Sequence, residues 1–66
     1  MTRLERRMRD ALEGNEREVL ERYNTEIVAE KSRKAQTRNA FVRQCCDQQI
    51  ERLSAEKRLI ERVTID

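Results

Sequence analysis

The sequence contains no proline, no histidine, one glycine and only two aromatic residues, Tyr23 and Phe41. Globular β and α/β domains depend on turns that glycine and proline favour, so this composition argues against both classes. No apolar run approaches the length of a membrane span or of a signal-peptide core. Without histidine, without a glycine-rich loop and with no cysteine beyond Cys45 and Cys46, catalysis and a zinc site have no support. We therefore expect no enzyme, no cofactor, no metal and no membrane partner.

The composition that remains is typical of a long helix or a coiled coil. The chain has 66 residues, of which 42% are charged with both signs interleaved and 36% are hydrophobic. So short a chain buries too little surface for a large core. Disorder is the competing interpretation because the charge is high, but the apolar residues recur regularly. An initial methionine without a targeting segment predicts a cytoplasmic protein or a segment of a longer one.

The N-terminal half, residues 1–27, carries an apolar stripe on helical spacing. Thr2 and Glu5 form a capping-box pattern, which predicts a helix from about Arg3. Met8 and Val19 are eleven residues apart, which is closer to a hendecad than to a heptad and predicts little or right-handed supercoiling. The stripe consists of Leu4, Met8, Leu12, Val19, Tyr23 and Ile27.

Gly14-Asn15 is the only pair in the sequence that favours a helix break. Gly14 is suited to a position just past a helix end, and Asn15 to capping a second helix. The alternative is a helix that runs through Gly14 at a cost of about 1 kcal/mol relative to alanine. We favour the continuous helix and leave the break as an open alternative.

The second half, residues 28–63, changes to the 4-3 spacing of a heptad repeat, with a stutter at Ile27-Val28. Asn39 takes an a position, where a buried polar residue sets the register at a cost in stability. We call the full set the predicted seam: Val28, Ser32, Ala35, Asn39, Val42, Cys46, Gln49, Leu53, Glu56, Ile60 and Val63.

These patterns predict an all-α protein in which residues 1–66 form a single coiled-coil segment. The leading prediction is one long helix of about 95 Å, at 1.5 Å per residue. The alternative is a helical hairpin that turns within residues 31–39, where Ser32, Thr37 and Asn39 tolerate a turn. The absence of glycine and proline from that stretch favours the long helix.

The flanks of the predicted seam argue against a simple parallel homodimer. In such a dimer Arg38 of one chain would meet Arg43 of the other, and like charges repel by a few tenths of a kcal/mol. A wider apolar face suits a bundle or a partner better than a two-stranded coil. The face is widened by Cys45, Ile50 and Leu59.

Charge is distributed unevenly along the chain. Residues 13–30 carry six acidic and two basic residues, whereas residues 31–43 carry five basic residues and no acid. We call these five the basic patch: Lys31, Arg33, Lys34, Arg38 and Arg43. The asymmetry predicts staggered or antiparallel pairing with another copy, or binding to an acidic protein surface such as that of a microtubule. Nucleic acid is a less favoured partner, because the net charge is only +2.

From Leu20 onward the mixed-charge pattern resembles the striated-fibre assemblin and beta-giardin family. The resemblance rests on Phe41 and on three stretches, Glu30-Lys31-Ser32-Arg33-Lys34, Gln49-Ile50-Glu51-Arg52-Leu53 and Arg58-Leu59-Ile60. It implies a non-motor cytoskeletal protein of basal-body-associated or microtubule-associated filaments, and it transfers no functional residue.

The sequence thus predicts a structural coiled-coil protein that associates with itself in a cytoskeletal or other larger assembly. The alternative is a binding module whose helix docks on another protein, either an acidic surface or an enzyme.

Overall fold

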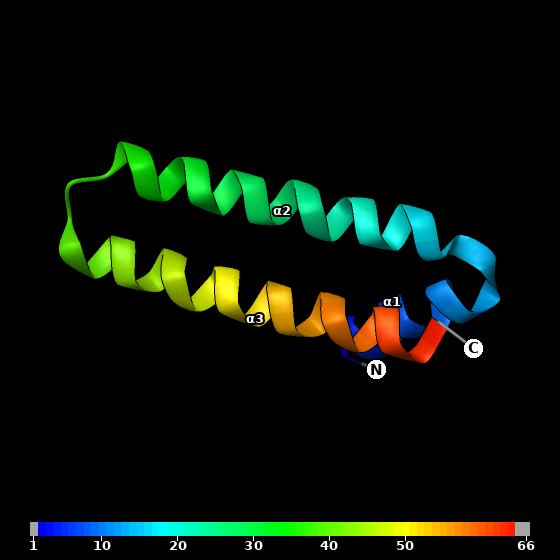
Figure 1. Cartoon of the computed structure of the whole chain (residues 1–66). Coiled ribbons are helices and arrows are strands. Elements are labelled where there is room, and N and C mark those ends of the chain that lie inside the picture. The colour runs from blue at the N-terminus through cyan, green and yellow to red at the C-terminus, as the bar shows by residue number, and fades with distance from the viewer. Residues whose placement is uncertain (1, 65–66) are drawn as a thin grey trace.

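The structure, a computed structural model, describes residues 2–64, and this part of the chain is helical without a strand. Helix α2 (Glu16–Gln36) and helix α3 (Ala40–Thr64) lie side by side as an antiparallel hairpin (Figure 1). Helix α1 (Arg3–Asp10) and the π-type turn η1 (Ala11–Asn15) lead into α2, and α1 lies beside the end of the hairpin where α3 finishes. The molecule measures 42 × 19 × 19 Å. The all-α prediction is confirmed, whereas the prediction of one long helix is wrong and the hairpin alternative holds.

The hairpin turns at residues 37–39, within the predicted range, and its own side chains close the turn. Thr37 leaves the helical conformation at φ −97° and ψ 144°, and its N–H donates to the Arg33 carbonyl at 3.2 Å. The Asn39 side-chain oxygen accepts from the N–H groups of Phe41 at 2.9 Å and Val42 at 3.2 Å. Asn39 is therefore the N-cap residue of α3, and asparagine is one of the residue types that helices prefer at this position.

This role corrects the interpretation of Asn39 as a buried residue that sets register. Asn39 is exposed, and its backbone N–H donates to the Thr37 hydroxyl oxygen at 3.3 Å. The same short polar side chain suits a heptad a position and a helix cap, so spacing alone does not separate the two roles. The cap satisfies two N–H groups that would otherwise lack an intrahelical partner.

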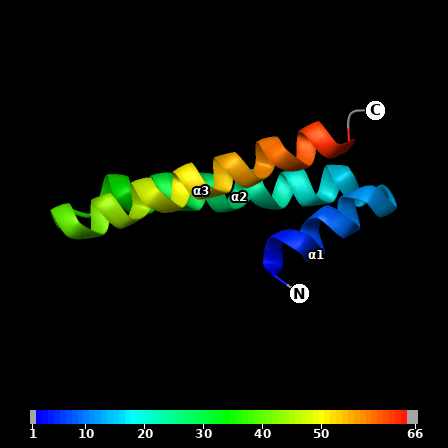
Figure 2. The ribbon, with the colours of Figure 1, turned by 90° about the horizontal axis from the view of Figure 1, so that it is seen from below.

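A second reversal of direction occurs at Gly14, where the sequence left a break as an open alternative. Gly14 has φ 104° and ψ 2°, in the left-handed region that glycine adopts without a steric penalty. The reversal lays α1 alongside the N-terminal half of α2 (Figure 2). Asn15 makes no side-chain capping hydrogen bond, so glycine provides the turn by itself. At the start of α1, the Thr2 hydroxyl oxygen accepts from the Glu5 N–H at 3.2 Å, as the capping-box pattern predicts.

The core lies at the end of the hairpin where three helical segments meet. Its buried members are Ala11, Val19, Tyr23, Leu53 and Ile60. Leu4, Leu20 and Ile27 pack against this cluster while remaining partly exposed. Towards the turn only α2 and α3 remain, and Cys46 is the buried residue between them there.

The predicted apolar positions divide between the core and the surface. In the N-terminal stripe, Val19 and Tyr23 are buried, Leu4, Met8 and Ile27 are half-buried, and Leu12 is 60% exposed. In the predicted seam, Cys46, Leu53 and Ile60 are buried and Val42, Glu56 and Val63 are half-buried. The exposed members are Val28, Ser32, Ala35, Asn39 and Gln49.

The predicted seam positions on α2 are exposed because the inward-facing residues of α2 keep the eleven-residue spacing of the N-terminal half. The inner side of α2 continues from Ile27 to Glu30 and Lys34, both half-buried, instead of moving to Val28. A stripe at four- and three-residue steps stays on one side of a straight helix. Because two of its members are charged, hydropathy does not mark them as interface residues.

Candidate functional site

The turn end of the hairpin, which we call the tip, carries the basic patch. Lys31 and Arg33 lie in the last turns of α2, Arg38 lies in the turn, and Arg43 lies in the first turn of α3. All four are exposed. The structure thus brings the five predicted basic residues to one end of the molecule, where residues 31–43 contain no acid.

Lys34, the fifth member, has a different surrounding from the other four. Its Nζ lies 2.5 Å from Asp47 Oδ1 of α3, and Lys34 is half-buried between the helices. This pair links α2 to α3 close to the turn. Lys34 therefore holds the tip together, while the other four cations face solvent.

Phe41 is the apolar feature of the tip. It is 73% exposed, more than any other large hydrophobic residue in the described part of the chain. Its backbone N–H donates to the Asn39 cap, so its position is set by the turn. An exposed aromatic among cations has the composition of a binding surface, since aromatic and arginine side chains dominate interface energetics. The sequence signal for this was an aromatic inside a basic run with no large apolar neighbour on its N-terminal side.

Beneath the tip, the interface between α2 and α3 contains a buried thiol next to a carboxylate. Cys46 is 1% exposed, and burial together with the neighbouring Glu30 carboxylate raises the pKa of its thiol. A thiol that remains protonated is a poor nucleophile and packs as a small hydrophobic group. Cys46 therefore packs as a small apolar group between α2 and α3, and its raised pKa lowers the fraction of thiolate.

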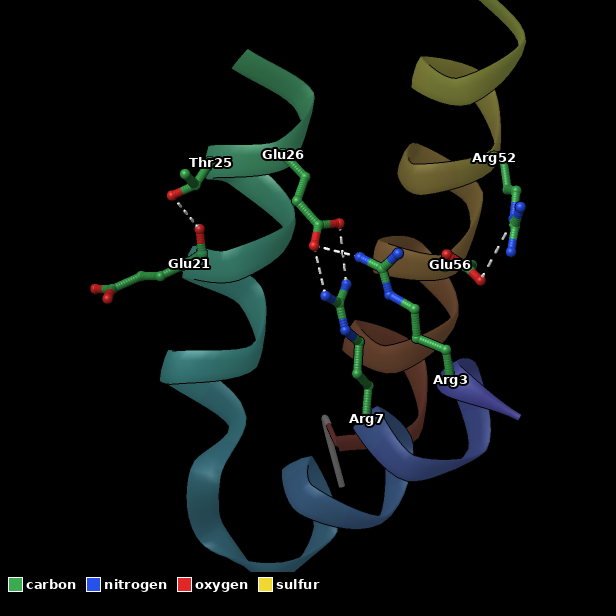
Figure 3. Close-up of polar contacts among 7 residues, drawn as sticks. All are labelled: Arg3, Arg7, Glu21, Thr25, Glu26, Arg52 and Glu56. Carbon is green, nitrogen blue, oxygen red and sulfur yellow. Dashed lines mark hydrogen bonds and ion pairs between the residues drawn. The ribbon is translucent and has the colours of Figure 1, made fainter. Parts of the chain in front are cut away.

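At the opposite end, α1 is clasped to α2 by an arrangement that the sequence did not predict (Figure 3). The Arg7 guanidinium donates to both Glu26 carboxylate oxygens, at 2.6 and 3.2 Å, and Arg3 donates to the same carboxylate. Arg7 also lies over the Tyr23 ring, 4.4 Å from its centroid. The hydrogen bond from Arg7, followed by its positive charge, lowers the pKa of Glu26, and the hydrogen bond to Glu26 raises the pKa of Arg7. Burial raises the pKa of the Tyr23 phenol.

The clasp, in which Arg3 and Arg7 of α1 bind Glu26 of α2, changes how the charge of the acidic segment, residues 13–30, is interpreted. Glu26 is paired with α1, Glu13 Oε1 lies 3.7 Å from Arg9 Nε, and Glu16 Oε1 lies 2.8 Å from the Thr64 hydroxyl of α3. Glu18 and Glu21 remain on the outer surface of α2, where Arg22 lines the same hollow. Much of the acidic charge is thus used within the fold, which weakens the hypothesis that this segment pairs with the basic patch of another copy.

Comparison with known proteins adds no constraint, because no family model, no curated protein and no solved structure matches the chain. In residues 2–64, none of the helices combines the length and the apolar character needed to cross a bilayer.

Proposed function

We propose that the protein is a non-enzymatic interaction module whose basic tip binds an acidic surface on a protein partner. One observation carries the proposal. Four exposed cations and the exposed ring of Phe41 share the turn end of a hairpin in which residues 31–43 contain no acid.

The chemistry of the tip suits carboxylate-rich surfaces. Arginine guanidinium groups bind carboxylates with two parallel hydrogen bonds, and three of the four exposed cations are arginines. A cluster of one sign of charge accelerates encounter with an oppositely charged partner. Phe41 adds an apolar anchor, which pure charge attraction lacks.

The tip also has internal contacts of its own. The Asn39 side chain caps the start of α3, and the Lys34–Asp47 ion pair links the end of α2 to α3. Binding therefore costs less conformational entropy than it would for a flexible basic loop.

The test is fluorescence anisotropy of a labelled glutamate-rich peptide titrated with the protein. We expect Arg38→Glu/Arg43→Glu to weaken binding by at least about tenfold, and Phe41→Ser by several-fold. Arg6→Glu/Arg17→Glu is the matched control, because both residues are exposed cations at the other end of the molecule and the double reversal changes the net charge by the same amount. Equal loss in this control variant would show that only net charge matters and would refute the proposal.

Duplex DNA and anionic vesicles, titrated under the same conditions, separate the alternatives. A preference for the peptide at physiological salt supports the proposal. A preference for DNA, with a steep salt dependence, would assign the tip to nucleic acid instead.

Self-association within a larger assembly, including a cytoskeletal one, is the second candidate function. It is favoured by large apolar side chains that remain outside the core, namely Leu12 at 60%, Val28 at 64% and Leu59 at 40% exposure. Such an assembly would be built from hairpins packed side by side. Sedimentation equilibrium tests it, and a monomer at high concentration would exclude it.

A further inference from the structure

The hairpin has two sides, and α1 covers part of only one of them (Figure 2). Arg3 of α1 lines a hollow with Glu26 and Gln49 on the covered side. A different groove between α2 and α3 is lined by Ile27, Val28, Lys31, Ser54, Lys57 and Arg58, and it contains no residue of α1. Glu26 and Ile27 are adjacent and therefore about 100° apart around α2, so the two hollows open on different sides.

We propose that this second groove binds an amphipathic helix with acidic flanks, supplied by a protein partner. The proposal concerns a surface that shares only Lys31 with the tip, and it does not depend on what the tip binds.

Ile27 and Val28 give the groove an apolar strip on its α2 side, and polar and charged side chains line the rest of it. Ile27 is partly buried against the core, and Val28 next to it is 64% exposed. Ser54 on the α3 side is small, which allows a partner to approach the helix closely. Ile50, one helical turn before Ser54, is half-buried and lines the adjoining hollow on α3. A helix laid along α2 and α3 would cover these side chains on the side of the hairpin that α1 leaves open.

The chain already shows that a helix fits the hairpin in this way. On the covered side, α1 lies beside α2 and α3, and its Leu4 packs against the core. The groove runs between two antiparallel helices, which is the geometry that receives a third helix through ridges and grooves. An amphipathic partner would present its apolar stripe at the i, i+3, i+4 and i+7 positions.

Charge selects the kind of helix. Lys31, Lys57 and Arg58 border the groove against one acid, Glu61, which lies 3.9 Å from Lys57. Neither Lys31 nor Arg58 forms an ion pair within residues 2–64. A partner helix with acidic flanks would supply the missing counter-charges on both borders.

The same charges argue against α1 of a second copy as the occupant. Helix α1 carries four arginines against one glutamate and one aspartate, so it is itself cationic. Placing it between Lys31 and Arg58 would bring like charges together. The groove therefore fits a foreign acidic helix better than it fits α1 of a second copy.

The experiment uses two synthetic helical peptides of about 18 residues, or five turns. Both carry a leucine stripe; one has glutamates on its flanks and the other has lysines. We expect the full chain to bind the glutamate peptide and to bind the lysine peptide at least about tenfold more weakly, by isothermal titration calorimetry. Amide chemical shifts should change in residues 24–31 and 54–61.

Substitutions then locate the site. Val28→Asp should reduce binding of the glutamate peptide by about tenfold. Leu12→Asp is the matched control, because Leu12 has similar exposure and lies in the turn η1, outside the groove. Circular dichroism of both variants checks that the fold is retained.

A reversal of charge gives the decisive result. Lys57→Glu/Arg58→Glu, which leaves every cation of the tip in place, should lose the glutamate peptide and gain the lysine peptide, which a merely unfolded variant would not do. Equal binding of the two peptides by the unmodified chain would overturn the proposal. Loss of the glutamate peptide in Arg38→Glu/Arg43→Glu but not in Val28→Asp would also overturn it. That pattern would place the peptide at the tip and leave the proposed function intact.

Discussion

Asn39→Ala distinguishes the hairpin from a continuous helix by the sign of a stability change. In the hairpin, the Asn39 side-chain oxygen caps α3 through the N–H groups of Phe41 and Val42. Alanine removes this acceptor and leaves two exposed N–H groups to water. Loss of an N-cap side chain costs about 0.5–2 kcal/mol, typically about 1 kcal/mol.

The effect is large relative to the whole molecule. A domain of this length is stable by roughly 3–10 kcal/mol, taking about 0.05–0.15 kcal/mol per residue. A loss of about 1 kcal/mol lowers the Tm of a small domain by about 4–8 °C. Thermal melts and urea titrations followed by circular dichroism at 222 nm resolve a shift of that size.

Matched substitutions at the same position identify the mechanism. Asn39→Asp keeps the acceptor and places a negative charge at a helix N-terminus, so stability should stay within a few tenths of a kcal/mol of the unmodified chain. Asn39→Gly should also cost only a few tenths. In a continuous helix the order reverses, because alanine has the higher helix propensity by roughly 0.5 kcal/mol and glycine the lower. An Asn39→Ala variant that melts at a higher temperature would therefore refute the hairpin.

Three further predictions follow from the other parts of the fold. Gly14→Ala should destabilise the protein by about 1 kcal/mol in urea unfolding, because φ 104° is unfavourable for an L-residue, whereas a helix running through Gly14 would gain stability. The Glu26 clasp should weaken as pH falls: its pKa is lowered in the fold, so its contribution is present above the ordinary value of 4.5 and is lost as pH falls through the native pKa. Glu26→Gln should remove this part of the pH dependence, and an unchanged acid profile would count against the clasp. Cys46 should react with iodoacetamide more slowly than half-buried Cys45, because Cys46 is buried and the pKa of its thiol is raised; mass spectrometry of partly labelled protein measures the two rates, and equal rates would contradict the buried position.

The helical class of this protein could be predicted from composition and spacing alone. Without proline and with one glycine, the chain has few ways to leave a helix, and its apolar residues recur at steps of three, four and seven. The cap at Thr2 depends on contacts within four residues, so the local pattern was sufficient to predict it.

The sequence was sufficient to predict which basic residues cluster, but not where in the molecule the cluster lies. Its five cations are close in the sequence, which makes the patch visible without a structure. Their position at the end of a hairpin depends on the turn, and so does the role of Lys34, whose partner Asp47 is thirteen positions away in the sequence. The clasp between Arg7 and Glu26 and the groove beside Val28 likewise depend on which segments the turns bring together.

The sequence by itself determined that the chain is helical and which local signals begin its helices. Only the tertiary structure decided that the chain reverses direction at Gly14 and at Asn39. Gly14 and Asn39 are each compatible with a continuous helix at a cost of about 1 kcal/mol or less. So small a local difference does not decide the fold. Packing α1 and α3 around Tyr23 contributes more, because burying one large apolar side chain contributes about 1.5–3 kcal/mol. The choice between a long helix and a hairpin therefore rests on packing between residues far apart in the chain, such as Tyr23 and Ile60 in the same core cluster, which local spacing does not encode.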